Sequence, residues 1–248
     1  MKAFLTKLFF GNLSNQKYSN LVPAYKKQWN NVLDIWNNKK IPDFGLERII
    51  RLFLSLSQFI FPGLLIRHIS GKYGLIQRKV AVEGYVILKL LFCFSVLILN
   101  ISNYRTIFIV NIYFLVDTLF YIASLIYLSN EFTEPISYRR SLTFLFINFI
   151  EIILYFSIIY SFYDLKKEDF LNTSLKSNLD AVYFSFVTSA TLGFGDYFPK
   201  DETAKIIVIF QIIVSFVFAG IFLNIFASRI QKESYFTKNN NDNNLKQN

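Results

Sequence analysis

Cysteine and histidine are almost absent from this 248-residue sequence, which has one of each, Cys93 and His68. A single cysteine excludes a disulfide within the chain, and this pair excludes a structural zinc site built from Cys and His ligands of one chain. Charged residues are also scarce, at 17%, whereas 53% of residues are hydrophobic and the mean hydropathy is +0.37. No grouping of nucleophile, base or metal ligands indicates an enzyme. The composition is typical of a membrane protein.

The net charge of +9 is concentrated in one third of the chain. Residues 1–84 contain 13 Lys or Arg and four Asp or Glu, while the remaining residues contain 13 of each kind. Basic segments beside membrane spans follow the positive-inside bias and attract anionic lipid headgroups. We therefore expect a basic cytoplasmic N-terminal region with anionic lipids as partners, and no nucleic acid.

Four apolar windows approach or exceed the roughly 20 residues that a transmembrane helix requires. They cover residues 85–101, 107–128, 142–162 and 204–230. The sequence thus predicts an all-α membrane protein with four transmembrane helices, the first two within 85–130. With four spans, both termini lie in the cytoplasm of a multi-pass protein, which we expect in the cell (plasma or inner) membrane.

A fifth apolar segment, residues 49–66, contains Arg51 and a Pro-Gly break. If it crossed the membrane, residues 1–48, with eight basic and three acidic residues, would lie outside, against the positive-inside bias. We therefore predict an interfacial or re-entrant helix at about 47–66. The Asn-rich residues 231–248 are predicted to form a disordered cytoplasmic tail.

Between the last two spans lies the stretch TSATLGFGDYFP, residues 188–199. Residues 180–190 before the glycines are apolar but too short to cross a bilayer as a helix, so this segment must enter the membrane and return. Glycine permits backbone with positive φ, and such irregular backbone is tolerated in a membrane only where it is buried in protein or lines a water-filled cavity.

The order of span, polar loop, short helix, TLGFGD and span resembles the pore module of tetrameric potassium channels, whose filter is usually written T-V-G-Y-G-D. The resemblance covers about residues 142–230 and implies a pore domain within 131–230. Its parts would be an outer helix at 142–162, a pore helix at 180–190, a selectivity filter at 191–196 and an inner helix at 204–230.

A potassium ion crossing a membrane exchanges its water shell for other oxygens, and backbone carbonyls supply these without burying a net charge. We assign the K⁺-coordinating carbonyls to Thr191, Leu192, Gly193 and Phe194. Gly193 and Gly195 permit the left-handed dihedrals that turn successive carbonyls toward one axis. Because one chain supplies one quarter of each carbonyl ring, a homotetramer is expected. K⁺ is the permeant ion, and no cofactor is expected.

Support for the filter is expected from Tyr183, Thr188 and Asp196. By resemblance, Tyr183 holds the pore-helix position whose side chain often bonds the carboxylate at the position of Asp196. Leu192 and Phe194 depart from the family's valine and tyrosine. Phe194 lacks the hydroxyl that ties the filter to the pore helix in the family, so packing must replace that bond.

On the last span, small and apolar residues recur every four positions and share one helix face. They are Ser215, Ala219, Leu223 and Ala227. The pattern fits either a water-filled cavity or a helix-packing seam. Gly220 is a candidate hinge, five residues beyond the position where the family's gating glycine would fall.

Two acids, Asp117 and Glu151, lie near the middle of predicted spans. An ionisable residue inside the membrane indicates either a functional site or interhelical hydrogen bonds by protonated or paired groups. Lys89 lies near a cytoplasmic end and is predicted to extend its amine toward water.

The sequence therefore predicts a potassium-selective ion channel that conducts passively. Two alternatives remain: a cation channel that also admits sodium, and a non-conducting accessory or scaffold protein of the membrane.

Overall fold

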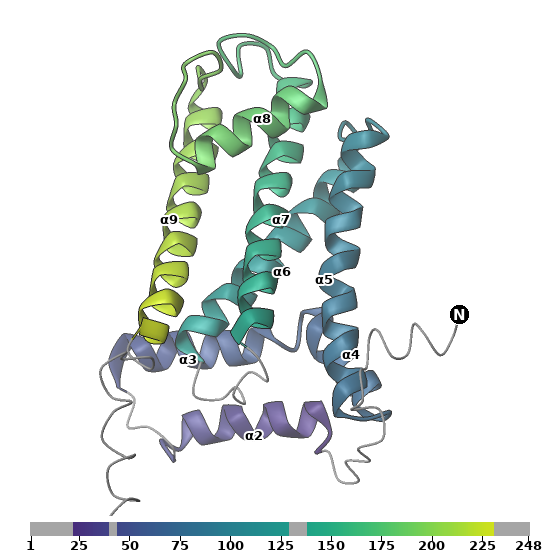
Figure 1. The fold of residues 1–248 in the computed structure, drawn as a ribbon, viewed down its shortest axis with the longest axis vertical. Helices are drawn as coiled ribbons and strands as arrows, with labels where there is room; N and C mark the ends of the chain where they lie inside the picture. Colours follow the sequence, from purple (N-terminus) through teal and green to yellow (C-terminus); the bar gives the residue numbers. More distant parts are fainter. Residues whose placement is uncertain (1–21, 40–43, 129–137, 231–248) are drawn as a thin grey trace, which may run out of the picture.

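The computed structural model describes residues 22–39, 44–128 and 138–230. Within these ranges the structure has eight helices and an isolated antiparallel β-bridge between Leu171 and Pro199 (Figure 1). They are α2 (Ala24–Trp36), α3 (Gly45–Ser57), α4 (Pro62–Gly71), α5 (Leu75–Ile98), α6 (Arg105–Tyr127), α7 (Tyr138–Asp164), α8 (Asn178–Ser189) and α9 (Glu202–Ile230). The predicted tail at 231–248 lies outside the described residues.

Four of these helices are long and apolar enough to cross a membrane, which confirms the predicted fold class. Their spans are Gln77–Ile98, Arg105–Tyr127, Arg140–Asp164 and Glu202–Asn224. The first begins eight residues before the predicted start at 85. A helix requires only continuous backbone hydrogen bonding, so α5 extends below the apolar window through the polar residues that precede it.

Helix α7 is the central element of the bundle. It packs against α5, α6, α8 and α9, and 61% of its span is buried within the chain, compared with 22% for α9. Aromatic contacts join α7 to its neighbours: the rings of Phe162 and Phe108 stack at 4.1 Å, and those of Tyr160 and Phe184 meet edge-on at 4.8 Å. Each such pair contributes about 0.5–1.5 kcal/mol beyond the area it buries. The surface of α9 that faces away from the other helices is exposed in the single chain.

The short helix α8 lies against α7 and α9 at the end of the bundle where α7 ends and α9 begins (Figure 1). The loop that follows α8 leads to the first residue of α9. The short helix α8 and the glycine-containing loop therefore lie between the third and fourth spans.

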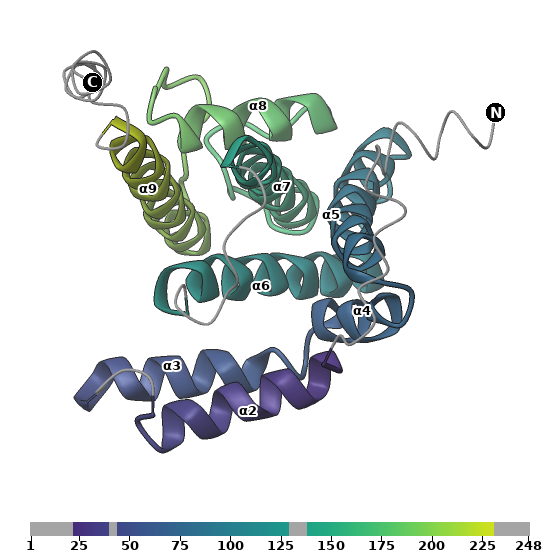
Figure 2. The same cartoon turned by 60° about the horizontal axis from the view of Figure 1, so that its bottom comes forward.

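At the opposite end, α2 and α3 lie side by side across the bundle, with α3 between α2 and α6 (Figures 1 and 2). The sequence predicted one helix at about 47–66, whereas the structure has α3 and α4, bent by 60°. Pro62 occupies the first turn of α4 after the extended Phe61, because proline starts a helix but cannot continue one. Helix α2 was not predicted, since its sequence is as polar as it is apolar.

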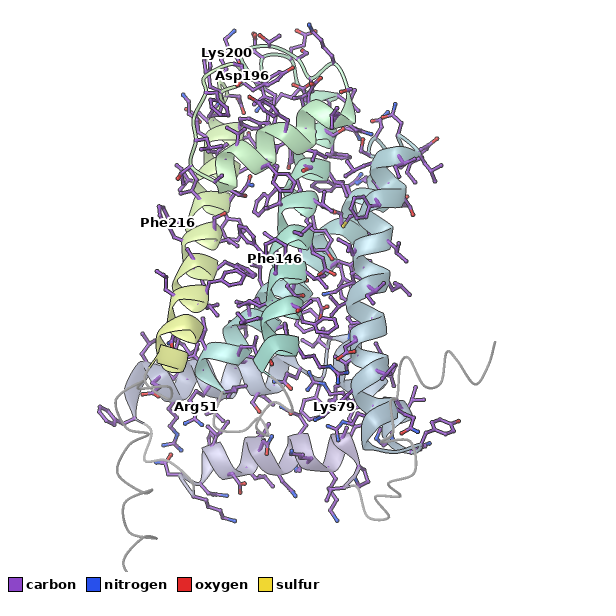
Figure 3. The ribbon with its side chains drawn as sticks, viewed as in Figure 1. Arg51, Lys79, Phe146, Asp196, Lys200 and Phe216 are labelled. Carbon is purple, nitrogen blue, oxygen red and sulfur yellow. The ribbon has the colours of Figure 1, made fainter. Side chains whose placement is uncertain are left out.

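Charged residues lie at both ends of the bundle. Asp196 and Lys200 lie at the α8 end, and Arg51 and Lys79 lie toward the α2 end (Figure 3). The four spans separate these two groups of polar residues.

Lys89 does not extend toward water, contrary to the prediction. It is 2% exposed, and its Nζ lies 3.2 Å from Asp117 Oδ2 and 3.5 Å from Glu151 Oε2. The Tyr85 hydroxyl donates to Asp117, and Lys89 donates to Thr118. The lysine is held inside because α6 and α7 offer it two carboxylates at the same depth, which the sequence of α5 alone does not reveal.

Candidate functional site

The helix that precedes the glycine-containing loop, α8, is capped at its N-terminus. Ser177 is the N-cap of α8: its side chain accepts from the backbone N–H of Asp180, and the Asp180 carboxylate accepts from the backbone N–H of Ser177. This reciprocal pair is a capping box, and a carboxylate in the first turn also suits the positive end of the helix dipole. The helix begins at Asn178, two residues before the predicted start, because Ser177 supplies the cap.

The other end of α8 holds the start of the loop. The backbone N–H of Thr191 donates to Thr188 O at 3.1 Å, and that of Leu192 donates to Val187 O at 3.0 Å. The first two loop residues are thus bonded to the last turn of the helix. Thr188, for which the sequence predicts a role in filter support, contacts the loop through its carbonyl group.

The loop backbone alternates in handedness over five residues. Thr191, Gly193 and Gly195 have φ of 55°, 60° and 84°, while Leu192 and Phe194 between them have negative φ. This alternation of φ permits successive carbonyl groups to turn toward the same side of the chain. This arrangement differs from an ordinary surface turn, which needs one or two such residues.

Thr191 is the unexpected member of this series. A β-branched residue rarely adopts positive φ, and such a conformation costs on the order of 1–3 kcal/mol. The Thr191 hydroxyl donates to Ala190 O at 2.7 Å, and the bonds to the α8 carbonyls restrain the residue from both sides. The sequence pointed to the two glycines but gave no sign of strain at Thr191.

The loop is exposed in the single chain. All residues from Thr191 to Asp196 are exposed, with Leu192 at 58% and Phe194 at 66%. A Cβ added at Gly193 or Gly195 would meet nothing within 4 Å, so the backbone dihedral, and not a lack of space, requires glycine here. Phe194 is thus mostly uncovered by residues of its own chain.

Tyr183 and Asp196 are brought together, at the positions expected from the resemblance. Interaction with the Asp196 carboxylate is the largest of the effects that raise the pKa of Tyr183. The ring of Tyr183 also meets that of Tyr197 edge-on, at 6.4 Å.

A residue that the sequence did not single out holds the far end of the loop. Asn172 donates from Nδ2 to Asp196 O at 2.9 Å and accepts at Oδ1 from the Phe198 N–H at 2.8 Å. Its own backbone N–H donates to Phe198 O at 3.0 Å. We call these three bonds the Asn172 clamp. Asparagine supplies a donor and an acceptor on one side chain, and so it can serve both groups.

Two ion pairs lie beside the clamp. Lys167 contacts Asp201 and Lys200 contacts Asp169, both at 2.6 Å. The hydrogen bond from Lys167 is the largest cause that lowers the pKa of Asp201 to about 2. The segment after α7 is therefore fastened to the segment before α9.

A second residue missed by the sequence reasoning lies on α9. Gln211 is 0% exposed and donates from Nε2 to Ser185 O, Ser185 Oγ and Ser189 Oγ at 2.7–2.9 Å, while its Oε1 accepts from the Tyr160 hydroxyl at 2.6 Å. The sequence offers one indication of this role: Gln211 is an amide within a long apolar segment, and a buried amide needs hydrogen-bond partners.

The predicted small-residue face of α9 is buried at one position and exposed at others. Ser215 is buried at 7% and donates to Gln211 O of its own helix, whereas Ala219 and Leu223 are exposed in the single chain. Gly220 is also exposed, within an uninterrupted helix. The side chain of Ala227 lies outside the described residues.

Comparisons with known proteins find similar sequences among ion channels. The sequence model of a family described as "Ion channel" matches residues 144–232, which hold most of α7 and all of α8 and α9. The chain is 28% identical over 203 residues to "Potassium channel K2" of Plasmodium falciparum (isolate 3D7) and 28% identical over 216 residues to the protein of that name in Plasmodium berghei (strain Anka). These matches cover 77% and 81% of this chain but only 13% and 14% of the relatives.

A third relative is "Two-pore potassium channel 4" of Arabidopsis thaliana, at 37% identity over 71 residues, 29% of this chain and 24% of the relative. No solved structure gives a significant match. The matched family is one of ion channels and not of enzymes. The chain is thus an integral membrane protein in which the segment from 144 to 232 is similar to the ion channel family.

Proposed function

We propose that this chain is one subunit of a potassium-selective channel in which residues 191–195 form the selectivity filter. The observation that carries the proposal is the alternation of φ at Thr191, Gly193 and Gly195. Carbonyls of Thr191, Leu192, Gly193 and Phe194 would replace the hydration shell of K⁺, the ion that the channel transports. The negative end of the α8 dipole, at Ser189, adds favourable potential for a cation beside the loop.

Four copies would complete the site. One chain supplies one strand of carbonyls, and its loop stays exposed without neighbours. The outer surface of α9 carries large exposed apolar residues at helical spacing, such as Ile206, Ile209, Ile213 and Phe216. The last of these points away from the bundle (Figure 3). In a homotetramer this surface would pack on adjacent copies and bring four loops to one axis.

Potassium flux from liposomes that contain the purified protein tests the proposal. We expect K⁺-dependent flux for the wild type and loss of flux for Gly193→Ala, because alanine at φ of 60° costs about 1–2 kcal/mol in each chain. Gly84→Ala is the matched control: Gly84 lies within α5, a Cβ there meets nothing within 4 Å, and flux should persist. Absence of flux from the wild type would leave the non-conducting accessory or scaffold protein as the function.

A cation channel that also admits sodium is the second candidate, and one observation favours it. Phe194 has no hydroxyl to bond α8 and is 66% exposed in its own chain, so neither a side-chain hydrogen bond nor close packing within one chain restrains this part of the filter. Reversal potentials in mixed K⁺ and Na⁺ distinguish the two candidates. A value near the K⁺ equilibrium potential supports selectivity, and a value near zero in symmetric total cation supports the alternative.

Lipid contact is proposed for the end that carries α3. Leu46, Ile49, Phe53 and Leu56 lie on one face of α3 and are exposed, as an interfacial helix requires. Beside them is an apolar groove of about 330 Å³, lined in part by Phe61 and Phe120. With the excess basic charge of residues 1–84, this end fits a cytoplasmic leaflet that contains anionic lipids. Flux compared between neutral and anionic liposomes checks this part, and equal flux in both would argue against it.

A further inference from the structure

One side chain of α9 forms hydrogen bonds to the last turn of α8. Gln211 Nε2 lies 2.9 Å from Ser185 O and 2.7 Å from Ser189 Oγ. Ser185 O accepts only, so the amide nitrogen must face α8 and the amide oxygen must face α7. The orientation of Gln211 is therefore fixed by its partners.

The same side chain reaches the third element of the pore module. Gln211 Oε1 accepts from the Tyr160 hydroxyl of α7 at 2.6 Å, and Ser185 Oγ donates to Ile153 O of α7 at 2.7 Å. Gln211, Tyr160 and Ser185 are each 0% exposed. Because a buried polar group without a partner is costly, these bonds resist separation of α7, α8 and α9.

A short path of hydrogen bonds leads from this network to the filter. Ser189 is the last residue of α8, and the carbonyls of Val187 and Thr188 in the same turn accept from Leu192 N–H and Thr191 N–H. A displacement of α8 at Ser189 would therefore move the first two carbonyl-bearing residues of the loop. Thr191 is the strained residue of the loop, and it depends most on such external restraint.

We propose that Gln211 is a positioning residue that makes the geometry of the selectivity filter depend on the placement of the inner helix α9. The proposal rests on the proposed channel function. Gln211 does not touch the ion; it acts through Ser185, Ser189 and the last turn of α8. A shift of α9 would thus be transmitted to the carbonyls of Thr191 and Leu192, and ion selectivity would depend on this amide.

The test measures the Na⁺ to K⁺ permeability ratio from reversal potentials of the full chain in planar bilayers. The ratio is independent of the number of channels, so a variant that only folds less well does not change it. For Gln211→Leu we expect the ratio to rise on the order of tenfold, the size expected from losing one or two buried hydrogen bonds. Tyr160→Phe, which leaves the bonds to α8 intact, should raise it by no more than about threefold.

Asn148→Leu is the matched control. Asn148 is also a buried amide of the pore module, but its Nδ2 donates to Phe144 O within α7 and its Oδ1 has no partner. Its replacement should leave the ratio at the wild-type value. If Gln211→Leu does not assemble, Ser189→Ala removes the contact nearest the filter and should raise the ratio in the same direction.

The outcomes separate the two proposals. A selective wild type with unchanged ratios in Gln211→Leu and Ser189→Ala overturns the role of Gln211 and leaves the channel function standing. An equal rise in Asn148→Leu also overturns it, because any buried amide would then have the same effect. A wild type without K⁺ conduction removes the channel function, and the role of Gln211 with it.

Discussion

The Lys89 ammonium lies 3.2 Å from the Asp117 carboxylate inside the membrane-spanning bundle, and it also approaches Glu151 at 3.5 Å. One lysine of α5 thus links α6 and α7. The contact fastens the two N-terminal spans to the outer helix of the candidate pore. It is an interhelical ion pair, one of the two interpretations that the mid-span acids allowed.

Removal of this lysine should destabilise the bundle. In Lys89→Met, two buried carboxylates lose their cation, and breaking a buried pair in this way costs about 3–5 kcal/mol. We expect a lower midpoint of thermal unfolding for the purified protein in detergent. The triple variant with Asp117→Asn and Glu151→Gln should recover most of the loss, since no uncompensated charge remains. A single variant as stable as the wild type would show that the pair contributes nothing.

The Asn172 clamp should set how long the candidate filter stays conductive. Asn172→Ala leaves Asp196 O and Phe198 N–H to bond with water, and each lost bond costs about 0.5–1.5 kcal/mol. We expect K⁺ current under a constant driving force to decay faster than in the wild type. Asp169→Asn is the comparison, because it removes only the exposed ion pair with Lys200, worth about 0–1 kcal/mol. Equal decay in both variants would contradict a special role for Asn172.

The interaction of Tyr183 with Asp196 gives a prediction with a defined direction in pH. This interaction raises the pKa of Tyr183 above its ordinary value of 10.0. Its stabilising effect is therefore fully present below pH 10 and is lost as the pH rises through the raised pKa. Tyr183→Phe should shorten the conducting state at neutral pH and remove the alkaline dependence above pH 10. Conduction by Tyr183→Phe that matches the wild type at every pH would reject the interaction as a support.

Because of the Lys167–Asp201 ion pair, we expect the α8 end to keep its stability at acidic pH. Because the bond from Lys167 lowers the pKa of Asp201 to about 2, the stabilisation is present above the ordinary value of 3.8 and is lost as the pH falls through about 2. In Lys167→Met, Asp201 should titrate closer to 3.8. Carboxyl chemical shifts of Asp201, followed by NMR between pH 5 and 2, measure both values. A midpoint that Lys167→Met leaves unchanged would assign the shift to Thr203 instead.

The periodicity and composition of the chain were sufficient for the fold class. Four apolar segments of membrane length have one stable solution in lipid, a bundle of helices, and the short segment before TLGFGD is too short to span. Gly193 and Gly195 could also be identified as backbone positions, because glycine is the residue that accepts positive φ without cost. These properties depend on residues close together in the sequence.

Contacts between distant residues were decided only by the tertiary structure. Asn172 meets Asp196 across 24 positions, Lys89 meets Asp117 across 28, and Gln211 meets Tyr160 across 51. Each of these polar side chains could equally have faced water or lipid headgroups. The sequence by itself determined which segments enter the membrane and where the backbone can turn left-handed, because hydrophobicity and dihedral freedom are local. Packing decided which buried polar groups satisfy one another, because that depends on how the helices meet in space.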